Sequence, residues 1–167
     1  ERIVCWDLRR LARLRALAGE TGTAIALARE AIARIGEARA SGTVDEVGDI
    51  AWTQVEAACR DALAALLEDT GSFEEALAER DLERVAARRL ALGAPADREA
   101  WWNCARADAD AAALAGRLGE SELALARHDD AVAARERVLE LAPATHLGVR
   151  RELGIALYAR AWERRRA

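Results

Sequence analysis

The sequence predicts an all-α protein, and three observations support that prediction. Residues that favour helices, chiefly alanine, leucine, arginine and glutamate, dominate nearly every segment. Residues that favour strands are sparse and never alternate with polar residues over a useful length. Only two prolines, Pro95 and Pro143, interrupt the 167 residues. We therefore expect long helices joined by short turns.

Turn and capping signals divide the chain into seven expected helices. The first five cover about residues 2–18, 23–40, 45–68, 73–92 and 97–126, a sixth follows a turn at His128–Asp129 and ends near Leu141, and a seventh covers 146–167. Asp45 is expected to cap the third helix, Ser72 with Glu75 the fourth, and Asp97 the fifth. Short turns make successive helices antiparallel, which fits either a bundle or a stacked solenoid.

Repetition favours the solenoid. Leu118-Gly119, Ala131 and Pro143 form the clearest unit, in which Gly119, Ala131 and Pro143 follow one another at intervals of twelve residues. This skeleton resembles the tetratricopeptide repeat. The resemblance implies that Gly119 in a first helix and Ala131 in a second allow two helix backbones to approach closely, and that Pro143 ends the second helix.

Two earlier segments show the same skeleton less fully. Leu63-Ala64 precedes Ala76, and Leu11-Ala12 precedes Ala24. The resemblance, to the long-helix bacterial type, implies a right-handed solenoid of about three repeats plus a C-terminal helix. The expected units of this single domain, 1–167, are 1–42, 43–96, 97–145 and a partial unit, 146–167. The alternative is an irregular alanine-rich bundle, and the first residue, Glu1, suggests a piece of a larger protein.

Charge and cysteine content limit the expected partners. The net charge is −4 and all 25 basic residues are arginines, so no overall positive field favours nucleic acid or an anionic membrane. No apolar run approaches the roughly 20 residues that span a bilayer. Cys5, Cys59 and Cys104 are odd in number and far apart, which is typical of buried core thiols in a reducing cytoplasm.

Catalytic signals are weak. Cys104 with His128 is one possible nucleophile and base, and a cysteine-dependent hydrolase is therefore the alternative function. No nucleophile elbow accompanies that pair, no closely spaced zinc ligands are present, and a phosphate loop is ruled out because its lysine is missing. We expect a protein that is not an enzyme and needs no cofactor or metal.

The expected function is that of a scaffold or sensor that binds a protein or peptide and regulates an attached effector. The resemblance implies that first helices line a concave binding face. Its expected lining residues are Trp6, Arg9 and Arg13, then Asp61, Ala65 and Glu68, then Glu120 and Leu123, with Trp101 as an exposed anchor. A further alternative is self-association through the C-terminal helix.

Overall fold

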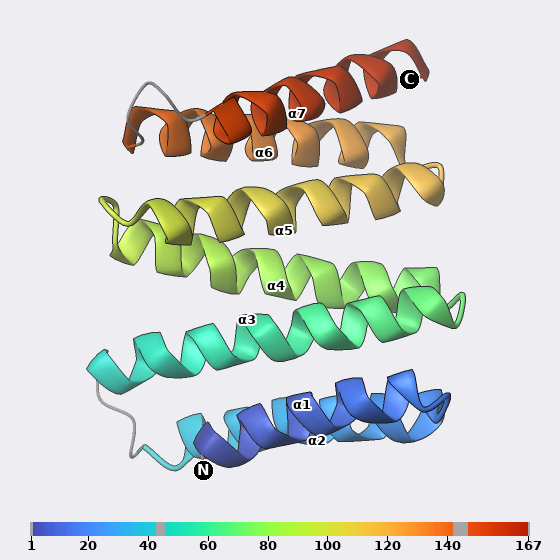
Figure 1. The fold of residues 1–167 in the computed structure, drawn as a ribbon, viewed down its shortest axis with the longest axis vertical. Helices are drawn as coiled ribbons and strands as arrows, with labels where there is room; N and C mark the ends of the chain where they lie inside the picture. Colours follow the sequence, from blue (N-terminus) through green and yellow to red (C-terminus); the bar gives the residue numbers. More distant parts are fainter. Residues whose placement is uncertain (1, 43–45, 142–146, 167) are drawn as a thin grey trace. The chain divides into compact units, whose positions relative to one another are not determined.

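The computed structural model describes residues 2–42, 46–141 and 147–166, apart from the side chains of residues 46 and 47. Within these ranges the chain forms seven α-helices (Figure 1): α1 (Arg2–Leu17), α2 (Thr21–Ala40), α3 (Glu46–Asp69), α4 (Phe73–Gly93), α5 (Arg98–Arg117), α6 (Ser121–Leu141) and α7 (Leu147–Arg166). The all-α prediction is confirmed. The expected cap at Asp45, the stop at Pro143 and the helix start at His146 lie outside the described residues.

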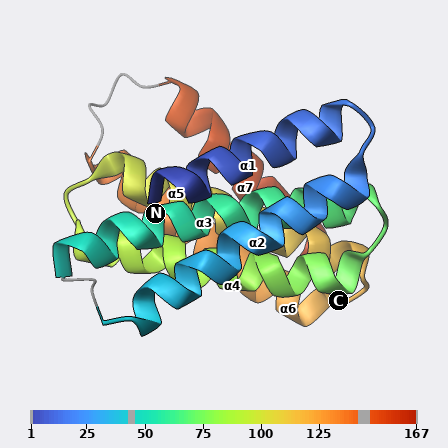
Figure 2. The same cartoon turned by 90° about the horizontal axis from the view of Figure 1, so that it is seen from below.

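The helices fall into two compact units, Glu1–Ala86 and Ala87–Ala167, whose boundary lies inside α4. In the first unit α1 and α2 form an antiparallel hairpin and lie side by side, and α3 packs against both of them (Figure 2). In the second unit α5 packs antiparallel against α6, and α6 packs against α7. The prediction of a single domain made of three repeats stays a prediction.

The same turn ends three of the odd-numbered helices. Gly19, Gly71 and Gly119 have φ values of +80°, +79° and +82°, a left-handed conformation that glycine adopts without strain. In each turn the residue after the glycine donates its N–H to a carbonyl five residues earlier, at 2.9, 2.9 and 3.0 Å respectively. This is the Schellman cap, which satisfies carbonyls at a helix end.

The third of these turns corrects two expectations. The fifth helix does not continue to residue 126, because α5 ends at Arg117 and the chain turns at Gly119. His128 lies inside α6 and not in a turn. Gly119 is exposed and does not lie in the seam between helices, so the expected close approach there is wrong. The predicted burial of Ala131 and Ala76 is confirmed, since both are fully buried.

The structure places the repeat in a different register. Pairs of alanines flank each glycine turn, seven residues before it and five after it, and every member is 0% exposed. These pairs are Ala12 with Ala24, Ala64 with Ala76, and Ala112 with Ala124. Each pair is twelve residues apart, as in the expected skeleton, but the third pair lies seven residues earlier than the sequence indicated. Alanine at both places lets the two helices of a hairpin pack closely.

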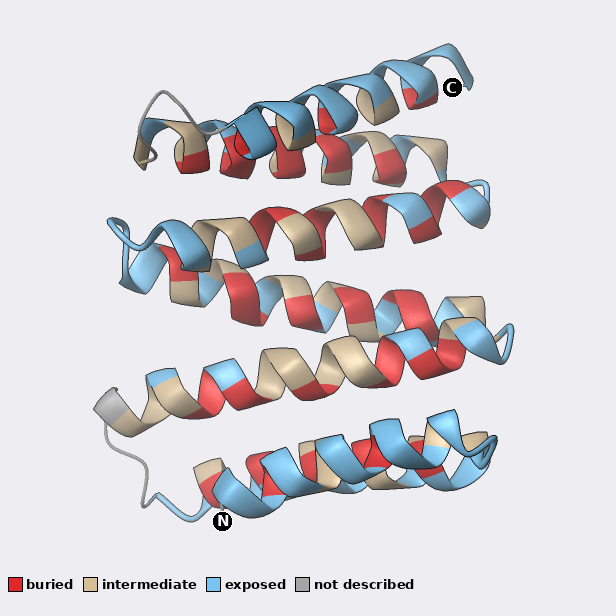
Figure 3. Cartoon of the chain, viewed as in Figure 1, coloured by how far each residue is buried: buried red, intermediate tan, exposed pale blue. Residues whose placement is uncertain are grey.

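Each unit has its own core of small and medium side chains, with the buried residues facing neighbouring helices (Figure 3). In the first unit Cys5, Ile35, Val55 and Cys59 form one cluster with Trp52. The second unit clusters alanines of α4, α5 and α6 around Cys104. All three cysteines are free and buried, as the sequence predicted.

The corrected position of Gly119 gives a direct test. Gly119→Ala should lower the free energy of unfolding by about 1 kcal/mol, because alanine is strained at positive φ. Gly36→Ala is the matched control: Gly36 lies inside α2 with open space beside it, so alanine there should stabilise by about 0.5–1 kcal/mol. Urea unfolding followed by circular dichroism measures both, and a stabilising Gly119→Ala would contradict the turn.

Candidate functional site

A cavity of about 440 Å³ lies between α1 and α3 in the first unit. We call it the α1/α3 groove. Helix α1 contributes Arg9, Arg10, Arg13, Ala16 and Leu17 to its lining, and α3 contributes Asp61, Ala62, Ala65, Leu66 and Asp69. The cationic side chains therefore come from α1 and the carboxylates from α3, and apolar side chains of both helices lie among them.

The charge difference between the two walls extends along both helices. Helix α1 carries five arginines and one aspartate, a net charge of +4. Helix α3 carries six acidic residues and one arginine, a net charge of −5. Within the lining itself the three arginines come from α1 and the two aspartates from α3, so the two walls of the groove carry opposite charge.

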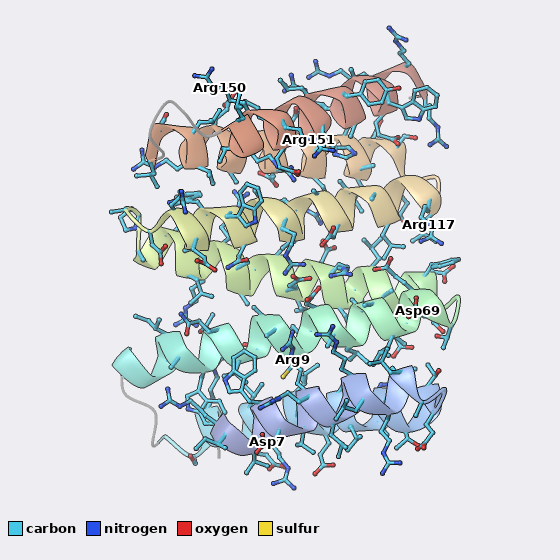
Figure 4. The ribbon with its side chains drawn as sticks, in the orientation of Figure 1. Asp7, Arg9, Asp69, Arg117, Arg150 and Arg151 are labelled. Atoms are coloured by element: carbon cyan, nitrogen blue, oxygen red, sulfur yellow. The ribbon has the colours of Figure 1, made fainter. Side chains whose placement is uncertain are left out.

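Arg9 connects the two walls. Its Nε donates a hydrogen bond of 2.9 Å to the carbonyl oxygen of Ala58 in α3, and its guanidinium lies 5.4 Å from the ring centroid of Trp6. That distance is within the range of a cation–π interaction. The Arg9 side chain lies between α1 and α3 in Figure 4, whereas Asp7 points away from α3. Arg9 thus links α1 to α3, and part of its hydrogen-bonding capacity is used by this contact within the fold.

Asp61 is held by a buried arginine of α4. Arg80 Nη1 donates to Asp61 Oδ1 at 2.6 Å and to Glu83 Oε2 at 2.9 Å, and Arg80 Nη2 donates to Glu68 Oε1 at 3.0 Å. The side chains of Arg80 and Glu83 are only 8% and 2% exposed. Charges so buried need partners of this kind, because desolvation of an unpaired ion is costly. The network fixes Asp61 at the edge of the groove and draws Glu68 toward α4.

Three other charged side chains of the groove make no such contacts with the described part of the chain. Arg10, Arg13 and Asp69 are exposed, and none forms a hydrogen bond or an ion pair with another residue in the described ranges. Asp69 is the last residue of α3 and lies at the end of the helix in Figure 4. These three groups are available to a ligand without breaking any contact of the fold.

The structure brings together most of the residues that the sequence selected in the first two units. Arg9, Arg13, Asp61 and Ala65 line the groove, and Trp6 lies beside it against Arg9. Sequence reasoning missed Arg10, Leu17 and Asp69. Helical spacing contained part of that signal, because Leu17 follows Arg13, and Asp69 follows Ala65, by four residues.

The remaining selected residues lie elsewhere. Glu68 faces α4 through its pair with Arg80. Glu120 lies in the turn before α6 and Leu123 lies in α6, so neither belongs to a first helix as expected. Trp101 is partly buried against the core of the second unit, and its Nε1 donates to the carbonyl oxygen of Pro95 at 3.2 Å. The Trp101 side chain is half-buried, and its role as an anchor for a partner stays a prediction.

Cys104 and His128 lie in different surroundings. The Cys104 thiol is fully buried, and its Sγ lies 3.7 Å from Asp108 Oδ2. Burial is the main cause that raises the pKa of Cys104 to about 12, and the negative charge of Asp108 adds to it. His128 lines a separate cavity with α7. A thiol that stays protonated at neutral pH is a poor nucleophile. Among the described residues no cluster of metal ligands occurs, and no described helix is long and apolar enough to cross a membrane.

Comparisons with known proteins give a fold likeness alone. No family model and no curated protein matches the chain. One similar solved structure is described as "DHF79 filament", with a TM-score of 0.47 and 20% sequence identity over 95% of this chain and 81% of that chain. This likeness assigns neither a family nor a function.

The Arg80 network predicts a large difference between buried and exposed arginines. Arg80→Met should lower the free energy of unfolding by roughly 3–5 kcal/mol, because it leaves buried carboxylates without their guanidinium. Arg15→Met is the control, since the Arg15–Glu20 pair is about half exposed and should contribute less than about 1 kcal/mol. Chemical denaturation measures both, and equal effects would contradict the role given to Arg80.

Proposed function

We propose that this chain is a protein-interaction module whose α1/α3 groove binds a short segment of a partner protein. The observation that carries this proposal is the set of unused charges, Arg10, Arg13 and Asp69, around an apolar lining. A groove of about 440 Å³ is within the usual size of a ligand pocket and accommodates a few side chains. No step of chemistry is needed for this role.

The charges suggest what the bound segment contains. A carboxylate can accept paired hydrogen bonds from the planar guanidinium of Arg10 or Arg13, which is the strongest common arginine contact. Asp69, at the negative end of the α3 dipole, favours a basic or hydroxyl group further along the groove. Leu17 and Leu66 provide apolar contact between these two places. We therefore propose a segment with an acidic group, an apolar side chain and then a basic group.

A finer assignment is part of the same proposal. The two alanines of each pair are twelve residues apart. The tetratricopeptide skeleton places small residues with this spacing where its two helices approach closely. We propose that the three hairpins are long-helix repeats of this kind in a right-handed array, and that partner binding on their first helices regulates an attached effector in the cytoplasm. The support is the recurrence of the glycine turn and of the buried alanines.

A random peptide library displayed on phage tests the groove against every combination of side chains at once. Selection on the intact chain should enrich peptides with Asp or Glu. The double variant Arg10→Ala/Arg13→Ala should bind the selected peptides on the order of 10-fold more weakly, as expected for a lost charge-assisted contact. Calorimetry with synthetic copies of the peptides measures the change.

The matched control removes the same charge outside the groove. Arg98 and Arg150 are exposed in the second unit and have no partner in the described part of the chain, so Arg98→Ala/Arg150→Ala should leave affinity unchanged. If both double variants weakened peptide binding equally, the cause would be the net charge of the protein and not a contact in the groove. Selection of peptides without any acidic preference would contradict the proposed role of Arg10 and Arg13.

Self-association through α7 is a second candidate. Large apolar side chains of α7 are exposed: Leu147, Ile155, Leu157, Tyr158 and Trp162. However, α7 carries six arginines and two glutamates, a net charge of +4, so two such helices repel each other. Association should therefore require salt, which screens that repulsion.

Light scattering at rising concentration and ionic strength tests this second candidate. Self-association through α7 predicts a molar mass above the 18.1 kDa of one chain at high salt, and Ile155→Glu should restore the single-chain value. A mass that stays at one chain under all conditions excludes the candidate. A larger mass that Ile155→Glu leaves unchanged excludes α7 as the contact.

A further inference from the structure

A second cavity, of about 400 Å³, lies among α5, α6 and α7 in the second unit. Its lining consists of Ala113 from α5, His128 from α6, and Tyr158, Ala159, Trp162 and Glu163 from α7. Tyr158 and Trp162 are mostly exposed, whereas His128 and Glu163 are buried. The cavity thus combines accessible aromatic rings with two buried polar groups.

Both buried groups have an atom without a partner. Glu163 Oε2 and His128 Nδ1 are shielded from solvent and accept or donate no hydrogen bond within the described residues. The other carboxylate oxygen, Oε1, has a contact of 3.5 Å with Arg166. Gly116 of α5 makes room for this carboxylate, because a Cβ at that position would lie 2.9 Å from Oε1. The carboxylate is therefore pressed against α5 with one oxygen unsatisfied.

Other buried carboxylates of the protein are treated differently. Glu83 receives a hydrogen bond of 2.9 Å from Arg80, and Asp108 receives one of 2.9 Å from Arg88. A buried carboxylate without such a cation loses its hydration and gains little in return. Glu163 differs from the other two because its residue also lines a cavity. An external group can reach that cavity and supply the missing contact.

We infer that this cavity binds an organic cation, an alkylammonium or guanidinium group, between Glu163 Oε2 and the rings of Trp162 and Tyr158. A carboxylate and a cation form a charge-assisted hydrogen bond, and the face of an indole or phenol ring attracts the same cation. An anion would meet the Glu163 carboxylate and the negative ring faces. The inference concerns the second unit and does not depend on the function proposed for the α1/α3 groove.

The nearby charges are compatible with a cation. Burial lowers the pKa of His128, which disfavours a charged imidazole beside Glu163. Arg160 and Arg164 lie at 3.3 and 3.7 Å from Asp129, which neutralises part of their charge. Arg166 is the competitor for Glu163, and its long contact and half-exposed side chain make it easy to displace. The shared chemistry of the ligand can come from a free amine or from an arginine side chain of a protein.

Nuclear magnetic resonance of the intact chain can test this inference with agmatine and with the tripeptide Gly-Arg-Gly as probes. His128 is one of only two histidines, so its ring signal can be assigned with a His128→Gln variant. We expect a saturable shift of the His128 ring and the Trp162 indole signals at probe concentrations below about 10 mM. Saturation by either probe supports the site, and a tighter tripeptide identifies protein arginine as its source.

Variants separate the Glu163 contact from general charge. Glu163→Gln should weaken binding by about 10-fold or more, since it removes the carboxylate charge. Trp162→Leu should weaken it several-fold by removing the ring at a partly exposed position. Glu136→Gln, on an exposed part of α6, makes the same change in net charge and should leave affinity unchanged.

Three outcomes would overturn the inference. The first is no saturable shift with either cation. The second is a Glu163→Gln variant that retains its helical circular dichroism and binds the probes as the parent does. The third is an equal or larger shift with inorganic phosphate, which would mean that the arginines of α7 form an anion site.

Discussion

The close approach of helices through small side chains is the constraint on which the rest of the structure depends. Most buried core residues are alanines, and the alanines on either side of each glycine turn are fully buried. An alanine buries little apolar area, so these helices are held by many close backbone and methyl contacts and not by a few large side chains. Replacing one of these alanines by a larger residue would force local shifts of the helix backbones and destabilise the contact.

Narrow seams of this kind leave polar groups at the edges of the contacts, and arginine–carboxylate pairs satisfy them. Arg39 of α2 pairs with Glu56 of α3, and Arg60 joins Glu56 to Glu79 of α4. In the second unit Arg88 reaches both Asp108 and Asp130. These pairs are partly or fully shielded from solvent, so each adds little net stability. Their main effect is to fix the register between neighbouring helices.

Pairing of this kind is incomplete in both candidate sites. In the α1/α3 groove Arg10, Arg13 and Asp69 stay exposed without partners in the described ranges. In the α7 cavity Glu163 keeps one unsatisfied oxygen beside accessible aromatic rings. Across the helix seams named above, the same residue types pair with one another. Both binding proposals therefore rest on charges that packing does not use.

The sequence by itself determined the class of fold, the ends of most helices, and the burial of the three cysteines, because helix propensity, turn chemistry and thiol hydrophobicity act locally. Its resemblance to the tetratricopeptide repeat also selected Arg9, Arg13 and Asp61, which the structure places on facing sides of α1 and α3. Only the tertiary structure decided the third turn and the partners of each charge. An alanine-rich segment offers small residues in more than one register, seven residues apart. The sequence pattern indicated Gly119 with Ala131, whereas in the structure Ala112 and Ala124 are the buried pair on either side of the turn. Glu68 likewise does not line the groove because it pairs with Arg80, which lies twelve residues further along the chain.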